Sequence, residues 1–238
     1  MNTETLDQPI VADVAVSAPA VVIESATPAV AAVAEGPNPF IALGLDGALV
    51  RAVSDLGYTQ PTEVQAKVIP LAMGSGKADE ASIDLMVSSQ TGSGKTAAFL
   101  LPVLNTLIAQ KAIEAAAEQA EFERQRAQAA ASGEAAPKRA KRKNPMQSRN
   151  FKAAVPGALV LCPTRELAQQ VAQDAIELVK HCKNLRVANV VGGMPYQLQI
   201  AKLQNADLVV ATPGRLLDLQ RSLQIKLDKV QFLVVDEA

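Results

Sequence analysis

Short runs of apolar residues recur along most of the chain, and each ends in small or polar residues. They cover 85–87, 158–161, 187–191, 208–210 and 232–235. Runs of this length predict strands that are buried on both faces. The stretches between them predict helices over 95–108, 166–180, 196–203 and 215–221. Strands that alternate with helices indicate an α/β fold, with a mainly parallel sheet covered by helices on both faces.

Two further helices are predicted before the first of these strands. Apolar residues from Phe40 to Leu56 have roughly helical spacing, and Gly57 supplies a stop. A second helix is expected after Pro61, with Thr62 as its N-cap.

Two segments depart from this pattern. Residues 1–37 are rich in Ala and Val and interrupted by prolines, which predicts a disordered tail. Residues 110–152 are far longer than an ordinary connection and predict an insertion, helical at first and disordered later. Its basic run at 138–143 is either a solvated surface or an auxiliary phosphate-binding arm. The expected divisions are therefore 1–37, 38–66 and 67–238, the last interrupted by the insertion.

Charge and cysteine content exclude several classes of protein. The net charge is −1, so any site for a polyanion must be local. Cys162, Cys182 and His181 do not have the spacing of a zinc site or a disulfide framework, which indicates a reducing, cytoplasmic compartment. The first basic residue is Arg51, and no apolar run approaches the roughly 18–20 residues of a membrane span. We expect neither a secretory signal nor a membrane segment.

The strand predicted at 85–88 leads into a phosphate-binding loop and then an apolar helix. The loop residues are Ser89, Gln90, Thr91, Gly92, Ser93, Gly94, Lys95 and Thr96. The two glycines let successive N–H groups point at phosphate oxygens, and the helix adds the positive end of its dipole. Lys95 would reach the β- and γ-phosphates, and Thr96 would bind Mg²⁺ together with an acidic residue at the end of another strand. Asp236 is the candidate for that acidic residue. Ser89 stands where the general motif has glycine.

Several motifs follow one another in a recognisable order. They are Gly57 to Gln65 with Phe40 upstream, the loop above, Pro163 to Ala168, Gly192-Gly193, Thr212 to Arg215, and Val234 to Ala238. Together they closely resemble the DEAD-box ATP-dependent RNA helicases. The resemblance extends from about Asn38 to the last residue, except for the insertion, and implies a RecA-like lobe that binds ATP and Mg²⁺.

The resemblance implies roles at the nucleotide. The segment that ends in Gln65, the Q motif of the family, would recognise adenine, since a glutamine amide can donate to and accept from one edge of the base. Gln60 belongs to the same segment, and Phe40 and Tyr58 would pack near the base, although both also suit ordinary core packing. Lys95, Asp236 and Glu237 would be catalytic, with Glu237 orienting and deprotonating the attacking water.

The resemblance also implies contacts with the RNA backbone, which carry no sequence preference. They fall on Pro163, Thr164, Arg165, Gly192, Gly193, Thr212, Pro213, Gly214 and Arg215. Each position has an ordinary alternative: a helix start at Thr164, a tight turn at Gly192-Gly193 and a cap at Thr212.

The family couples ATP hydrolysis to local RNA strand separation between two lobes. The chain ends at Ala238, inside the signature that begins at Asp236, so we expect it to lack the second lobe, with its arginine fingers, and to be inactive alone. Two alternatives stay open: a non-catalytic module that binds nucleotide or RNA, and a translocase that acts on DNA.

Overall fold

The computed structural model describes residues 21–24, 38–74, 84–132 and 152–237. Its elements in chain order are β1 Val21–Glu24, α1 Gly47–Asp55, α2 Glu63–Gly74, β2 Leu85–Ser88, α3 Lys95–Ser132, β3 Ala158–Leu161, α4 Arg165–Leu178, β4 Val187–Val190, α5 Tyr196–Leu203, β5 Leu208–Ala211, α6 Pro213–Arg221 and β6 Phe232–Val235. The strands and helices expected from the sequence lie where the apolar runs predicted them.

A four-stranded parallel sheet forms the centre of the fold. Its strand order is β4-β5-β3-β6, and β3 is paired in register with both β5 and β6. The strand that precedes the phosphate loop, β2, is not in this sheet but pairs in parallel with β1. The parallel α/β prediction is confirmed, with the difference that the strands divide between two sheets.

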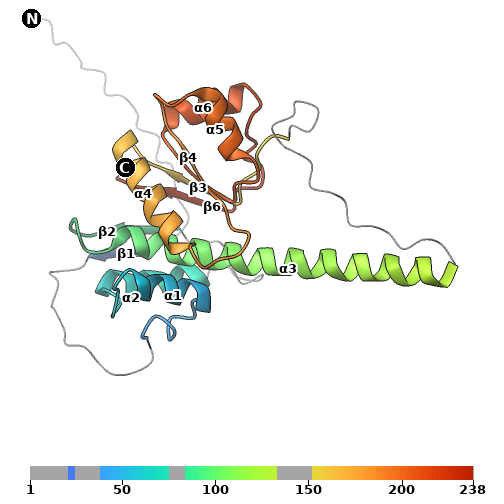
Figure 1. Cartoon of the computed structure of the whole chain (residues 1–238). Coiled ribbons are helices and arrows are strands. Elements are labelled where there is room, and N and C mark those ends of the chain that lie inside the picture. Colours follow the sequence, from blue (N-terminus) through green and yellow to red (C-terminus); the bar gives the residue numbers. More distant parts are fainter. Residues whose placement is uncertain (1–20, 25–37, 75–83, 133–151, 238) are drawn as a thin grey trace, which may run out of the picture.

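Both faces of the four-stranded sheet are covered, except at β6. Successive side chains of a strand point to opposite faces. Ala158 and Val160 of β3 accordingly pack in a core with residues of α1, α3 and α4, whereas Leu159 packs with α5 and α6. Figure 1 shows α5 and α6 together on one side of the sheet.

The α5–α6 layer does not reach β6. Leu233 and Val235 point to that face and are 60% and 55% exposed, while their neighbours Phe232 and Val234 pack against the larger core. Among the described residues β6 also pairs with β3 alone, so it is an edge strand. An apolar edge of this kind is prone to association.

Strand β1 lies within the segment that the sequence predicts to be a disordered tail, and for residues 21–24 that prediction is wrong. Val21 to Glu24 pair with Leu85 to Ser88. Val-Val-Ile is a favourable strand sequence, and pairing with β2 satisfies backbone groups that a local pattern cannot assign. The remainder of the tail lies outside the described residues.

Helix α3 extends from the phosphate loop far into the predicted insertion. Its first part is buried, including Leu100, Leu101 and Leu104, and the rest projects away from the molecule (Figure 1). At the point of departure, Nζ of Lys111 lies 2.9 Å from a carboxylate oxygen of Asp207. The helical part of the insertion is thus confirmed, while the basic run at 138–143 lies outside the described residues.

By length and composition α3 is also apolar enough to cross a membrane. An 18-residue window has a mean hydropathy of 1.4, and 44% of that window is buried inside the protein. Its apolar side chains belong to the same core as α1, α4 and the sheet. This is the arrangement of a core helix, and it gives only weak evidence for a membrane span.

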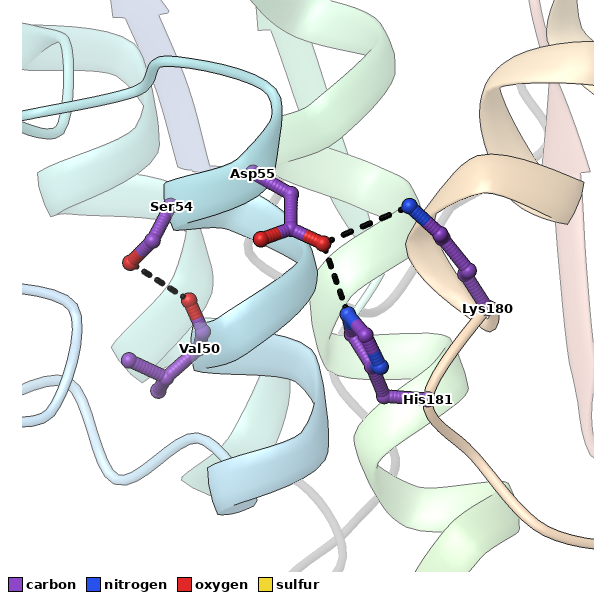
Figure 2. Close-up of polar contacts among 5 residues, drawn as sticks. All are labelled: Val50, Ser54, Asp55, Lys180 and His181. Atoms are coloured by element: carbon purple, nitrogen blue, oxygen red, sulfur yellow. Dashed lines mark hydrogen bonds and ion pairs between the residues drawn. The ribbon is translucent and has the colours of Figure 1, made fainter.

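Helix α1 is held against the end of α4 by polar contacts (Figure 2). Asp55 accepts a hydrogen bond from Nε2 of His181 at 2.7 Å, and Nζ of Lys180 lies 3.5 Å from the same carboxylate oxygen. These contacts lower the pKa of Asp55, with the hydrogen bond to His181 as the largest cause. Helix α1, which precedes Gln65 in the chain, is thereby held against the residues that follow α4.

Candidate nucleotide and RNA site

The residues singled out in the sequence gather along one edge of the sheet. Because β3, β5, β4 and β6 are parallel and in register, their carboxyl ends lie side by side. The loops that leave these ends carry Pro163 to Arg165, Thr212 to Arg215, Gly192-Gly193 and Asp236-Glu237. Open α/β sheets bind ligands at this edge. The strand order places the three predicted RNA loops over β4, β5 and β3, and the two carboxylates at β6.

The phosphate loop has the backbone that its glycines allow. Gly92 and Gly94 have φ of +82° and +85°, in the left-handed region. Nζ of Lys95 turns back and donates to the backbone carbonyls of Ser89 and Gln90, the latter at 2.9 Å. The hydroxyls of Ser89 and Ser93 are 2.6 Å apart. The side chain of Lys95 therefore folds back over the loop, and its ammonium group lies beside the loop backbone.

Gln65 is hydrogen-bonded to this loop. Its Nε2 donates to the carbonyl of Gly94 at 3.2 Å, and its Oε1 accepts from the backbone N–H of Thr62 at 3.1 Å. A Cβ on residue 94 would lie 2.4 Å from Nε2, so glycine is required there for space as well as for φ. Gln65 is only 4% exposed. Its amide is thus engaged within the protein, whereas the sequence predicted that it faces adenine.

A cavity of about 390 Å³ joins the phosphate loop to the carboxylates. Its lining residues are Leu56, Tyr58, Thr91, Gly92, Gly94, Lys95, Thr96, Ala97, Leu167, Gln170, Asp174, Glu177, Leu178, Asp236 and Glu237. The structure therefore brings the predicted catalytic residues and the predicted magnesium ligands into one space. Tyr58 lines the same cavity and is 42% exposed, which suits contact with a base.

Phe40 and Gln60 do not line this cavity. Phe40 is fully buried in the main core, so its alternative role as a packing residue is the one that the structure has. Gln60 is on the surface and outside the cavity lining. The contact of Phe40 with a base, which the family resemblance implies, stays a prediction.

The two carboxylates lie in an environment that favours a cation. Burial raises the pKa of Asp236, the charge of Glu237 raises it further, and Lys95 lowers it. Burial and the same two carboxylates raise the pKa of the Cys162 thiol beneath them to about 11. Within the described ranges no cluster of three or more His, Cys, Asp or Glu side chains is placed to enclose a metal. The donor set, a hydroxyl and a carboxylate, suits Mg²⁺ that keeps waters and phosphate oxygens as ligands.

Arg165 lies against the glycine pair of the β4 loop. A Cβ on Gly193, whose φ is +85°, would be 3.0 Å from Nη1 of Arg165, and a Cβ on Gly192 would be 3.4 Å from its Nε. Thr164 caps α4 by accepting from the N–H of Leu167 at 3.2 Å. The Arg165 guanidinium and the Gly192-Gly193 backbone are thus neighbours, although they follow different strands, β3 and β4.

Thr212 and Arg215 lie at the start of α6. Thr212 is the N-cap of the helix but makes no side-chain capping bond. Nη1 of Arg215 donates to Oε1 of Gln199 at 2.9 Å and to the carbonyl of Met194 at 3.3 Å. The sequence pattern does not single out Gln199, because Gln197 on the same short helix is of the same type. Only its full burial, seen in the structure, distinguishes it.

Comparison with known proteins assigns the chain to a family. The sequence profile of the DEAD/DEAH box helicases matches residues 62–238. The chain is 40% identical over 200 residues to the DEAD-box ATP-dependent RNA helicase 52A of Oryza sativa subsp. japonica, covering 84% of this chain and 28% of that protein. It is 35% identical over 206 residues to the ATP-dependent RNA helicase DeaD of Escherichia coli, covering 86% and 25%.

Solved structures agree. Dbp5 of S. cerevisiae bound to RNA and ADP BeF3 has a TM-score of 0.56 and 27% identity, covering 84% of this chain and 38% of that one. Prp28 of Chaetomium thermophilum bound to ADP has a TM-score of 0.56 and 31% identity, covering 82% and 37%. The chain spans about a quarter of the length of the first relatives. On the profile match and the shared RecA-like fold, this chain belongs to the DEAD/DEAH box helicase family.

Proposed function

We propose that the chain provides the ATP-binding lobe of an ATP-dependent RNA helicase, in which RNA-stimulated ATP hydrolysis drives local strand separation. The observation that carries the proposal is the single cavity that holds Lys95, Thr96, Asp236 and Glu237. The relatives named above are RNA helicases, and one structural neighbour was solved with RNA and a nucleotide.

In this proposal each residue has a separate task at the nucleotide. The N–H groups of the loop and the start of α3 hold the phosphates, and Lys95 exchanges its two carbonyl partners for phosphate oxygens. Thr96 and Asp236 would hold Mg²⁺, which would supply positive charge against the phosphate oxygens. Glu237 orients the attacking water and takes its proton. Tyr58, which lines the cavity, would contact the base, and Gln65 holds the loop in place through its hydrogen bond to Gly94.

The RNA backbone would lie over the loops that follow β4, β5 and β3. Arg165 and Arg215 supply positive charge there, and Gly192-Gly193 and the start of α6 supply backbone N–H groups. Binding through phosphates predicts a steep dependence on salt and little dependence on base sequence. The motif from Pro163 to Leu167 favours RNA over the DNA translocases that share a phosphate loop.

We also propose that residues 1–238 alone do not hydrolyse ATP efficiently. The charge that develops on the transferring phosphate needs further cationic groups, which the family resemblance assigns to a second lobe. The competing function is a module that captures nucleotide or RNA without turnover. We also propose a cytoplasmic location, which is supported only by the cysteine content noted above.

Phosphate release with and without single-stranded RNA tests the helicase proposal, measured on the natural product of whatever length the cell makes. RNA should stimulate release, and Lys95→Ala or Glu237→Gln should each reduce it by about 10²-fold or more. Lys67→Ala, an exposed lysine paired only with Glu63 among the described residues, is the matched control and should have no effect. Nucleotide binding without RNA-stimulated release, unchanged by Glu237→Gln, would favour the binding module instead.

A further inference from the structure

Gln199 is a polar side chain that is fully buried in the structure. It lies on α5 and is 0% exposed. Burying an amide is unfavourable unless its donor and acceptor are both satisfied. Both are: Nε2 donates to the carbonyl of Val191, and Oε1 accepts from Nη1 of Arg215 at 2.9 Å. One side chain thus connects two segments that are far apart in the sequence.

The two segments are loops of the proposed RNA site. Val191 directly precedes the pair Gly192-Gly193, and Arg215 lies in the first turn of α6. Because an amide is planar and its two polar atoms have a fixed separation, bonding at both ends sets the distance between the two loops. A hydrophobic residue of the same size would fill the space but leave the loops free to shift.

The guanidinium of Arg215 is restrained on several sides. In addition to Gln199, its Nη1 donates to the carbonyl of Met194 at 3.3 Å, and its Cζ lies 5.8 Å from the ring centroid of Tyr196. Both hydrogen bonds leave from Nη1. In the described part of the chain no hydrogen bond from Nε or Nη2 is recorded, so this edge of the planar guanidinium is available to a phosphate, which arginine binds with two parallel N–H groups.

We propose that Gln199 is a positioning residue for binding of the nucleic-acid backbone. In this proposal, Gln199 orients Arg215 so that its Nε and Nη2 edge is free for a phosphate. It also fixes the distance between Arg215 and the Gly192-Gly193 backbone, so that consecutive phosphates of one strand contact both. The inference rests on the RNA-binding function proposed above and adds a residue that the motifs do not contain. Its loss lowers affinity because a freely rotating arginine must be ordered when RNA binds.

The test is a double-mutant cycle in the 238-residue chain, with fluorescein-labelled oligouridylate as the probe and anisotropy as the readout. Gln199→Met keeps the volume and removes both hydrogen bonds, and Arg215→Ala removes the charge. We expect Gln199→Met to weaken binding about tenfold and the double variant to bind no worse than Arg215→Ala alone. Gln197→Met, an exposed neighbour on the same helix, is the matched control and should bind like the wild type.

Two further readouts separate positioning from a loss of fold. Affinity for a magnesium–ATP analogue should be unchanged in Gln199→Met, because the nucleotide cavity does not include α5 or α6. Gln199→Glu, which keeps an acceptor for Arg215, should recover part of the RNA affinity. Two results would overturn the positioning role alone. In the first, the losses of binding free energy from Gln199→Met and Arg215→Ala add in the double variant. In the second, Gln199→Met binds RNA like the wild type while Arg215→Ala does not. A wild-type chain with no RNA affinity overturns the RNA function as well.

Discussion

At the scale of single residues, the phosphate loop depends on Gly94 more than on Gly92. Both have positive φ, which costs a non-glycine residue about 1–2 kcal/mol. Only Gly94 also faces a neighbour, since a Cβ there meets Nε2 of Gln65 at 2.4 Å while a Cβ on Gly92 meets nothing within 4 Å.

Gly94→Ala should therefore weaken nucleotide binding by at least about tenfold, and Gly92→Ala should weaken it less, because only the first displaces Gln65. Titration of each variant with a fluorescent ATP analogue measures the difference, and urea unfolding shows how much of it is stability. Equal losses in the two variants would mean that the contact between Gln65 and Gly94 does not shape the loop.

The sequence predicts some site residues and not others, for physical reasons. Lys95, Thr96 and Asp236 follow from local patterns, because a phosphate loop and a strand end are continuous in sequence, and they do share a cavity. The internal bonds of Gln65 and Gln199 join residues distant in sequence, and the burial of Phe40 depends on the assembled core. Periodicity cannot distinguish such glutamines from solvated ones.

At the scale of elements, Asp55 connects α1 to α4 through His181 and Lys180 (Figure 2). The contacts lower its pKa, so the ionised carboxylate stabilises the fold. That contribution is complete above the ordinary value of 3.8 and is lost as the pH falls through the lowered pKa of the folded state.

Asp55→Asn should therefore lower the Tm slightly at pH 6, and the difference from the wild type should shrink as the pH falls below 3.8 and disappear below the lowered pKa of the folded state. The effect is small because the pair is exposed to solvent. Thermal unfolding across this pH range measures it, with Asp228→Asn, an exposed aspartate, as the control. A difference in Tm that persists unchanged in strong acid would rule out the ion pair as its cause.

The elements themselves were predictable where a pattern is local. The apolar runs at β3 and β5 are buried strands, whereas the run at β6 forms a strand with one exposed face. Thr62 and Thr164 cap helices as their residue type suggests. Strand β1 was not predictable, because its partner β2 is distant in sequence and prolines surround it. Strand pairing is a tertiary contact, and it outweighs the local composition.

At the scale of the molecule, the candidate site depends mainly on the register of the parallel strands. This register aligns the carboxyl ends of β4, β5, β3 and β6, and so arranges the loops proposed to bind RNA and the carboxylates proposed to act at the nucleotide along one edge. The uncovered face of β6 at Leu233 and Val235 lies at the end of this edge. The fold class could be predicted from the alternation of strands and helices, whereas the division into two sheets could not.

The central claim is that the loop before α3 and the carboxylates after β6 form one magnesium-dependent nucleotide site. Titration of the 238-residue chain with a non-hydrolysable, fluorescent ATP analogue, with Mg²⁺ or with EDTA, tests it most directly. We predict binding that weakens at least about tenfold without Mg²⁺, in Lys95→Ala and in Asp236→Asn. Binding that is indifferent to the metal and to both substitutions would contradict the account.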